Sequence, residues 1–436
     1  MKMGVVADDI TGANDIGIMF ARSGYLVHVY TWDPAAPFRH EEGLHLPDVA
    51  ILNTNSRLDP ARLAYDKVQA ATRRLQAAGC RQFFNKTCSV FRGNIGAEFD
   101  AMLDALEQEF ALVVLGFPRN GRLTIDGVHY VHGVRLEESE FRNDPVHPMT
   151  RSNLVEILGS QARRRVARIG HDVVERGPAA LRREIAAMRS RCNYLILDVA
   201  DQEALETIAR AAWDYPVLCG SSALAEELPA AWEPVYPRPV GRQDFEAAAV
   251  LPAAAPAAVL CVAGSLMPQT LAQIRHLSAR GVPALELDTL RLFDGDERRA
   301  ALETLDRELG AYLLAGRDAL LYAANSPETV ARTRAAGRAR GLSLSEVSRL
   351  VSGALAELAA GLAARAGLAR LVVAGGETSA AVCARLGVDA VRVWREIQPG
   401  LPSCISLGSP PLLLVLKSGS FGTPDFLEQA VAHLKE

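Results

Sequence analysis

The 436-residue sequence lacks the marks of several common protein classes. Its seven cysteines are scattered and include no Cys-x-x-Cys pair, which argues against both a zinc site and a disulfide framework. The most apolar segments are short and broken by proline, glycine or lysine, and the N-terminus has no apolar core typical of a signal peptide. We therefore expect a cytoplasmic protein with no membrane partner.

The sequence also lacks a strong charge and the standard nucleotide motifs. A formal net charge of −4 and a pI near 6.2 give no electrostatic reason to expect a nucleic acid partner. There is no Gly-x-x-x-x-Gly-Lys-Ser/Thr loop, and no Gly-x-Gly-x-x-Gly follows the first apolar run. Any nucleotide must be bound by another arrangement.

What the sequence does contain is an alternation of short apolar runs with amphipathic stretches, which predicts an α/β fold. At this length we expect two domains, each with a mostly parallel sheet flanked by helices. A Pro- and Ala-rich stretch places a linker at 236–257, between a first domain at 1–235 and a second at 258–436. Strands are predicted at 3–7, 49–53, 111–115, 194–198, 217–219, 258–263, 319–323, 370–374 and 411–416.

Helix signals are clearest in the stretch between the second and third predicted strands. Asp59 is a plausible N-cap, Pro60 suits the first helical position, and Gly79 suits the end. Further on, the Ala- and Leu-rich stretch at 346–368 has helical spacing, which is typical of packing positions rather than of a cofactor site.

Three loops of the predicted second domain share a composition suited to phosphate. Each follows a strand and combines glycine with Ser or Thr before a helix, so that backbone N–H groups and hydroxyls are exposed together. They read GSLMPQ, GGETS and KSGSFG and begin at residues 264, 375 and 417. One such loop is usually just a tight turn. Three in one domain favour a phosphate or nucleotide site.

Polar residues also follow the strands of the predicted first domain. Asp8 and Asp9 come directly after the first strand, and Lys86, Arg92 and Asn94 lie between later elements. Arginine can bind a carboxylate through two hydrogen bonds, while amides and acids hold hydroxyls, so a small polyhydroxy acid fits this set. The alternative is that the arginines pair with surface acids and Asn94 caps a turn.

Two histidines, His129 and His132, lie three positions apart in what we expect to be an extended hairpin. No third ligand has suitable spacing, and we predict no metal site from the protein's own residues.

Several motifs, taken together, resemble those of the four-carbon acid sugar kinases, the family of D-threonate, D-erythronate and 3-oxo-tetronate kinases. They occur in one order over nearly the whole chain, which makes the resemblance specific. The motifs are VVADDITGANDIG, NTNSR, RGNIGAEFDAMLDAL, FPRNGR, VHGVRLEESEFRNDP, GGETS and LKSGSFG.

The resemblance implies that the first domain binds a sugar acid, that the second binds ATP, and that the terminal hydroxyl of the acid is phosphorylated. Mg²⁺ is implied by the ATP chemistry. Whether the protein forms a homodimer is left open. By motif, the nucleotide would contact Ser265, Gly375, Gly376, Glu377, Thr378 and Gly419. The substrate would contact Arg57, Lys86, Arg92, Gly93 and Asn94.

The sequence departs from the family pattern beside the predicted substrate residues. Cys88 stands where many members have aspartate, and Val90 stands where they have threonine. Arg119 replaces a common acid. Substrate identity is therefore not transferred, although Cys88 can also be read as a small buried residue with no chemistry.

Asp8 and Asp9 are the predicted catalytic residues. Phosphoryl transfer needs an aligned hydroxyl, a proton acceptor and positive charge around the transferred group. Neighbouring residues on an extended chain point in opposite directions, so we expect the two acids to have different tasks. The alternative for Asp9 is a cap on the helix that follows.

Two other function classes remain open at this point. A sugar-acid oxidoreductase or lyase could use the same α/β pattern, although no dinucleotide motif supports it. A non-catalytic sugar-acid binding protein could use two lobes without ATP turnover, and fold alone does not separate these.

Overall fold

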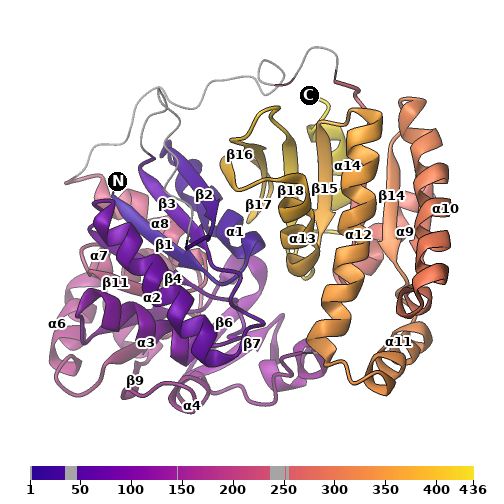
Figure 1. The fold of residues 1–436 in the computed structure, drawn as a ribbon. Helices are drawn as coiled ribbons and strands as arrows, with labels where there is room; N and C mark the ends of the chain where they lie inside the picture. The colour runs from indigo at the N-terminus through magenta and orange to yellow at the C-terminus, as the bar shows by residue number, and fades with distance from the viewer. Residues whose placement is uncertain (1, 35–46, 145, 236–250, 252–254) are drawn as a thin grey trace. The chain divides into compact units, whose positions relative to one another are not determined.

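The computed structural model describes residues 2–34, 47–144, 146–235, 251 and 255–436. The chain divides into two compact units, Met1–Gln243 and Asp244–Glu436, here called unit 1 and unit 2 (Figure 1). Most of the predicted linker at 236–257 lies outside the described residues. The fold is α/β, with mostly parallel strands flanked by helices, as the sequence predicts.

The strands of unit 1 run in the order β2-β3-β1-β4-β11-β5-β10-β9, and every pairing among them is parallel. Parallel pairing brings the carboxyl ends of β1, β3 and β4 to one edge, where Ala7 lies between Asn53 and Lys86. The strands are β1 Met3–Ala7, β2 Val27–Thr31, β3 Val49–Asn53, β4 Gln82–Lys86, β5 Ala111–Val114, β9 Val166–Ile169, β10 Tyr194–Leu197 and β11 Val217–Gly220.

The helices of unit 1 form two groups by their contacts. Helix α3 contacts both α2 and α4, and α1, α8, α7, α6 and α5 form a second continuous series. Their bounds are α1 Ile10–Ala21, α2 Ala61–Ala77, α3 Ile95–Leu106, α4 Leu154–Gly159, α5 His171–Val174, α6 Pro178–Met188, α7 Gln202–Ala212 and α8 Ala223–Trp232. Short 3₁₀ turns lie at Pro118–Asn120, Leu136–Glu138 and Glu140–Asn143.

The predicted start of α2 is wrong in one detail. Pro60, in an extended conformation, is the residue that precedes the helix, and it offers no side-chain cap. Asp59 does not cap it, because its carboxylate accepts a hydrogen bond from Lys67 Nζ at 2.6 Å. The predicted end is confirmed, since Gly79 follows the last turn with a φ of +91°.

A small antiparallel sheet, β6-β7-β8, lies within unit 1. It comprises β6 Arg122–Ile125, β7 Val128–Val131 and β8 Val134–Arg135. It contains His129 and confirms the expected hairpin.

The strands of unit 2 run in the order β13-β14-β12-β15-β18-β17-β16. The first five are parallel, and β17 pairs antiparallel with both β18 and β16. Their bounds are β12 Leu260–Ala263, β13 Ala284–Leu287, β14 Ala319–Ala323, β15 Arg370–Ala374, β16 Ala390–Gln398, β17 Leu401–Ser406 and β18 Leu413–Lys417.

Helices again pack in two groups in unit 2. Helix α12 contacts α10, α11 and α13, whereas α9 contacts α14. Figure 1 shows α12 as a long orange ribbon beside α13 and β15. The helices are α9 Pro268–Ala279, α10 Gly295–Leu314, α11 Pro327–Ala339, α12 Leu344–Ala366, α13 Gly376–Leu386 and α14 Phe426–His433, with a 3₁₀ turn at Thr289–Phe293.

Within the described residues, α12 alone has the length and hydropathy of a membrane span. Half of its most apolar window is buried, and core helices of soluble proteins meet the same criteria. Every predicted strand is found within a few residues of its expected position, and the Ala- and Leu-rich stretch is α12.

Candidate functional site

Asp8 and Asp9 lie at the carboxyl end of β1 and share one cation. Arg57, which follows β3, donates from Nε and Nη2 to the two oxygens of Asp8, each at 2.8 Å. Its Nη1 donates to Asp9 Oδ2 at 2.5 Å. The expectation that the two acids point in opposite directions is therefore wrong here. Asp9 keeps an extended backbone as the residue that precedes α1, and the guanidinium of Arg57 nevertheless reaches both carboxylates.

Asp9 is also the N-cap of α1. Its Oδ1 accepts from the backbone N–H of Gly12 at 2.7 Å, and its Oδ2 accepts from Thr11 Oγ1 at 3.0 Å. Burial alone would raise the pKa of Asp9, but Arg57, Lys86 and the hydrogen bonds together lower it. The capping alternative is thus observed, and Asp9 is held as an anion by fixed partners.

Lys86 ends β4 and faces a second acid that the sequence analysis missed. Its Nζ lies 3.5 Å from Asp15 Oδ2 and donates to the Thr87 carbonyl at 3.1 Å. The same Asp15 oxygen accepts from Ser222 Oγ at 2.7 Å. Burial raises the pKa of Asp15 to about 6, although Lys86 and Ser222 oppose this. This cluster joins α1, β4 and the start of α8.

Several buried polar atoms beside this cluster have no hydrogen-bond partner among the residues that the structure describes. They are both side-chain amide atoms of Asn14, Asp15 Oδ1, Asn85 Oδ1 and Thr87 Oγ1. Because buried polar groups in native proteins are normally satisfied, these atoms are suited to bind water or ligand hydroxyls. Asn14 and Asp15 belong to the VVADDITGANDIG motif, and Asn85 and Thr87 flank Lys86 in the sequence.

Arg92 lies between Cys88 and Asp144. Its Nε donates to Cys88 Sγ at 3.3 Å, and its Nη1 donates to Asp144 Oδ2 at 2.6 Å. Burial would raise the pKa of the Cys88 thiol, but the charges of Arg92 and Arg57 lower it. In contrast, burial raises the pKa of the other six thiols, which are those of Cys80, Cys192, Cys219, Cys261, Cys383 and Cys404.

Gly93 and Asn94 shape the loop rather than present free polar groups. Gly93 has a φ of +104°, and a Cβ at this position would lie 3.1 Å from Arg57 Cγ. Asn94 precedes α3, but its amide donates to the carbonyls of Ser56 and Asp59 at 3.0 and 2.8 Å. Both residues therefore fix the position of the Arg57 segment.

Glu98 is a buried acid behind this cluster that the sequence analysis also missed. Ser56 Oγ donates to its Oε1 at 2.7 Å. Burial, and then the charge of Asp8, raise the pKa of Glu98 well above its ordinary value. The raised pKa favours the protonated form of Glu98.

The histidines of the small antiparallel sheet are not arranged as metal ligands. His129 Nδ1 lies 3.2 Å from Thr124 Oγ1, and burial with the charge of Arg122 lowers its pKa to about 3. His132 Nε2 lies 3.4 Å from Arg122 Nη1. In the described part of the chain, no three His, Cys, Asp or Glu residues are grouped so as to hold a metal ion.

The predicted nucleotide loops of unit 2 meet at the carboxyl ends of β12, β15 and β18. A Cβ on Gly419 would lie 2.1 Å from Ser265 Oγ, and one on Gly264 would lie 2.1 Å from Thr378 Oγ1. Gly375, with a φ of +122°, lies against both Ser265 and Thr378. The close approach of three backbones explains why the loops are rich in glycine.

Gly376 and Glu377 lie in the first turn of α13, whose N-terminus carries a partial positive charge. Gly376 is its first residue. The carboxylate of Glu377 accepts a hydrogen bond from Ser348 Oγ of α12, and burial raises its pKa. The Glu377 side chain is thus directed to α12.

Lys417, the last residue of β18, is fully buried beside these loops, and the sequence analysis did not select it. Its place in KSGSFG was the available signal. Its Nζ donates to Thr270 Oγ1 at 3.0 Å and to the Gly419 carbonyl at 3.3 Å.

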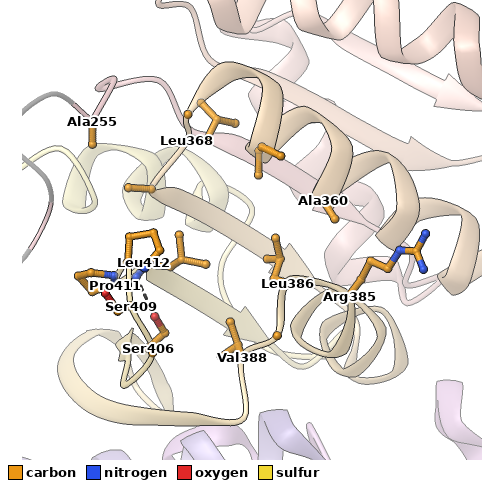
Figure 2. A pocket seen from close by; sticks show the side chains of 17 residues that line it. Ala255, Ala360, Leu368, Arg385, Leu386, Val388, Ser406, Ser409, Pro411 and Leu412 are labelled. Atoms are coloured by element: carbon orange, nitrogen blue, oxygen red, sulfur yellow. Dashed lines mark hydrogen bonds between the residues drawn. The ribbon is translucent and has the colours of Figure 1, made fainter.

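A pocket of about 580 Å³ opens elsewhere in unit 2, between the ends of α12 and α13 and the β17–β18 turn (Figure 2). Leu368, Leu386 and Pro411 line it. It adjoins the amino-terminal ends of β15 and β18, opposite the glycine loops, and contains none of the predicted site residues.

Comparisons with known proteins match unit 1 and unit 2 to two different domain families. Residues 3–228 match a family described as a sugar-binding N-terminal domain, and residues 260–427 match a nucleotide-binding C-terminal domain. The chain is 36% identical to a 3-oxo-tetronate kinase of Cupriavidus necator, over 99% of this chain and 97% of that protein. It is 35% identical, over the same shares, to a 3-oxo-tetronate kinase of Pseudomonas savastanoi pv. phaseolicola.

Among solved structures, the chain resembles a protein of Salmonella typhimurium described as a putative tRNA synthase. The TM-score is 0.78 at 29% identity, and 98% of each chain is covered. A Haemophilus influenzae protein, HI1011, gives a TM-score of 0.70 at 26% identity, over 99% of this chain and 100% of the other. The sequence relatives carry the functional information, and from them the chain belongs to the four-carbon acid sugar kinase family.

Proposed function

We propose that this kinase transfers the γ-phosphoryl group of ATP to the terminal hydroxyl of a 3-oxo-tetronate or a closely related four-carbon acid. Full-length identity of 36% to a protein of that name is the observation that carries the proposal. The two units would act as separate domains of a cytoplasmic enzyme, unit 1 for the acid and unit 2 for the nucleotide.

In unit 1, we assign the proton-accepting role to Asp8 rather than Asp9. Asp9 is already used as the cap of α1 and as an anionic partner of Arg57. The two oxygens of Asp8 are bound by Arg57 alone among the described hydrogen bonds, and a carboxylate has about four lone-pair sites, so capacity for a substrate hydroxyl remains. Arg57 then orients Asp8 for that hydroxyl.

Arg92 and Lys86 are the proposed partners of the substrate carboxylate. Each already faces one acid, Asp144 and Asp15 respectively, so each cation is positioned before the substrate arrives. Positive charge held in place in a buried site favours an anionic substrate without a further ordering cost.

In unit 2, the backbone N–H groups around Gly375 and Gly419 and the hydroxyls of Ser265 and Thr378 would receive the phosphates. The described residues offer no cluster of carboxylates for Mg²⁺. In the proposed reaction, Mg²⁺ would arrive on the nucleotide phosphates, which supply most of its ligands in many kinases.

The proposal is tested by ADP release from Mg·ATP with 3-oxo-tetronates, D- and L-threonate, and D- and L-erythronate. Asp8→Asn is the active-site variant, and Asp296→Asn, at a carboxylate 95% exposed in unit 2, is the matched control. Turnover of one acid that is lost only in Asp8→Asn supports the proposal. Turnover of none of these acids by the wild-type protein contradicts it.

A further inference from the structure

Lys417 sits beneath the last glycine loop in a closed set of hydrogen bonds. Its Nζ donates to Thr270 Oγ1 and to the Gly419 carbonyl, and Thr270 Oγ1 donates to the same carbonyl at 2.8 Å. Thr270 belongs to the first turn of α9. The arrangement therefore fixes the Gly419 peptide, whose Cα packs against Ser265.

The ammonium group has no negative partner among the described residues. The side chain of Lys417 is 0% exposed, and its two hydrogen-bond acceptors are uncharged. A buried charge is normally paired, since taking a lone ion out of water is costly. An unpaired lysine at a predicted phosphate site therefore requires an explanation.

The charged groups on the neighbouring elements do not supply that partner. On α13, Glu377 is turned to Ser348. On α9, His276 and Arg280 pair with Glu428 of α14.

The remaining neighbours are the strands on either side of β18. Arg370 lies at the opposite end of β15, and β17 carries no charged residue. The thiols of Cys404 on β17 and Cys383 on α13 have pKa values raised by burial, to about 12 for Cys383, and stay neutral. Burial alone lowers the pKa of Lys417, to about 7.

We propose that Lys417 is a positioning residue of the nucleotide site that holds the Gly419 peptide and takes up a proton when the nucleotide phosphates bind. This inference rests on the proposed function, because it places the phosphates at the glycine loops. The N-termini of α9 and α13 add partial positive charge at the same edge, so an anion is the counter-charge that this edge of unit 2 lacks.

The sign of the effect follows from linkage. In the free protein the lysine is half-protonated near pH 7, and a bound anion favours its charged form. Nucleotide binding should then take up a proton at pH 8 and very little at pH 6. The affinity for Mg·ATP should fall as the pH rises above 7.

The experiment is isothermal titration calorimetry of Mg·AMP-PNP, a non-hydrolysable analogue, into the full-length protein at pH 6, 7 and 8. Each titration is repeated in buffers of different ionisation enthalpy, which measures proton uptake directly. The variants are Lys417→Met, which keeps the length but removes the charge, and Lys417→Arg, which stays charged at every pH used. Melting temperature and sugar-acid binding by unit 1 report folding.

We expect about one proton taken up by the wild type at pH 8 and none by either variant beyond that due to the nucleotide itself. Lys417→Met should weaken nucleotide binding by roughly 10- to 100-fold at pH 6, and Lys417→Arg should bind with an affinity that changes little with pH.

Wild-type binding without proton uptake, or Lys417→Met that binds like the wild type, would overturn the inference and leave the kinase proposal intact. A wild-type protein that binds no nucleotide would overturn the kinase proposal itself, and the inference with it. If Lys417→Met does not fold, proton uptake by the wild type and its loss in Lys417→Arg still decide the matter.

Discussion

The guanidinium of Arg57 binds the carboxylate of Asp8 through two parallel hydrogen bonds of 2.8 Å, one from Nε and one from Nη2. The pair joins the loop after β3 to the end of β1 and is largely shielded from water, with side-chain exposures of 14% and 1%. Such a planar, doubly bonded pair is specific to arginine.

Arg57→Lys should therefore behave as a loss rather than a conservative change. We expect kcat/KM for the sugar acid to fall roughly 100-fold or more, since misplaced catalytic groups commonly cost this much. Arg57→Ala should in addition lower the free energy of unfolding by about 3–5 kcal/mol, because Asp8 and Asp9 would remain buried without their cation. Steady-state kinetics and urea unfolding measure these effects. An Arg57→Lys variant with wild-type kcat/KM would contradict the role given to Arg57.

Gly419→Ala should damage the nucleotide site selectively. The added Cβ would lie 2.1 Å from Ser265 Oγ, so Ser265 or the loop must move. We expect KM for ATP to rise roughly tenfold, as expected for a lost or displaced charge-assisted contact, with KM for the acid unchanged. Gly353→Ala is the matched control, because this glycine lies inside α12 with open space at its Cβ. Equal effects of the two substitutions would refute the prediction.

Cys88 should be the cysteine most reactive at low pH. The charges of Arg92 and Arg57 lower the pKa of its thiol, and thiolate is the reactive form. Iodoacetamide labelling at pH 6 to 7, followed by peptide mass spectrometry, should find label first on Cys88, and the sugar acid should slow it. The residue is only 7% exposed, so the absolute rate will be small. Faster labelling of Cys219, whose pKa is raised by burial, would contradict this.

Asp15 should make stability depend on pH in a distinctive window. Burial raises its pKa from 3.8 to about 6, so the folded state binds the proton more tightly than the unfolded state. The contribution of Asp15 to stability is therefore lost as the pH rises from about 4 to 6, by about 3 kcal/mol. Relative to Asp15→Asn, the wild type should lose this amount between pH 4 and pH 7 in urea unfolding. A difference between the two proteins that is constant with pH would exclude the raised pKa.

The sequence predicts the architecture well because the buried strands of parallel α/β folds appear in the sequence as short apolar runs. The order of the strands then brings Asp8, Arg57 and Lys86 to one edge, although the first and the last are 78 positions apart in the sequence. The family motifs led to the same residues. Their roles in substrate binding and catalysis stay predictions.

What the sequence did not reveal is which polar groups are buried. Asn14 and Asp15 look like an exposed helix face, but α1 is buried on every side, and Asp15 meets Ser222, 207 positions away. Lys417 looks like a charge at the end of a strand, whereas the surrounding loops enclose it completely. Such contacts depend on the packing of segments that are distant in the sequence. Local sequence patterns therefore do not predict them.

The cap of α1 gives the sugar site a natural spectroscopic reporter. The backbone N–H of Gly12 is bonded to Asp9 Oδ1, and the other oxygen of Asp9 is bonded to Arg57. A ligand that accepts a hydrogen bond from Arg57 weakens the bond between Arg57 and Asp9. It must therefore change the electron density at the Asp9 carboxylate and the chemical shift of the Gly12 amide. In a glycine-selective ¹⁵N spectrum, this single resonance would follow occupancy of the acid site without any label attached to the substrate.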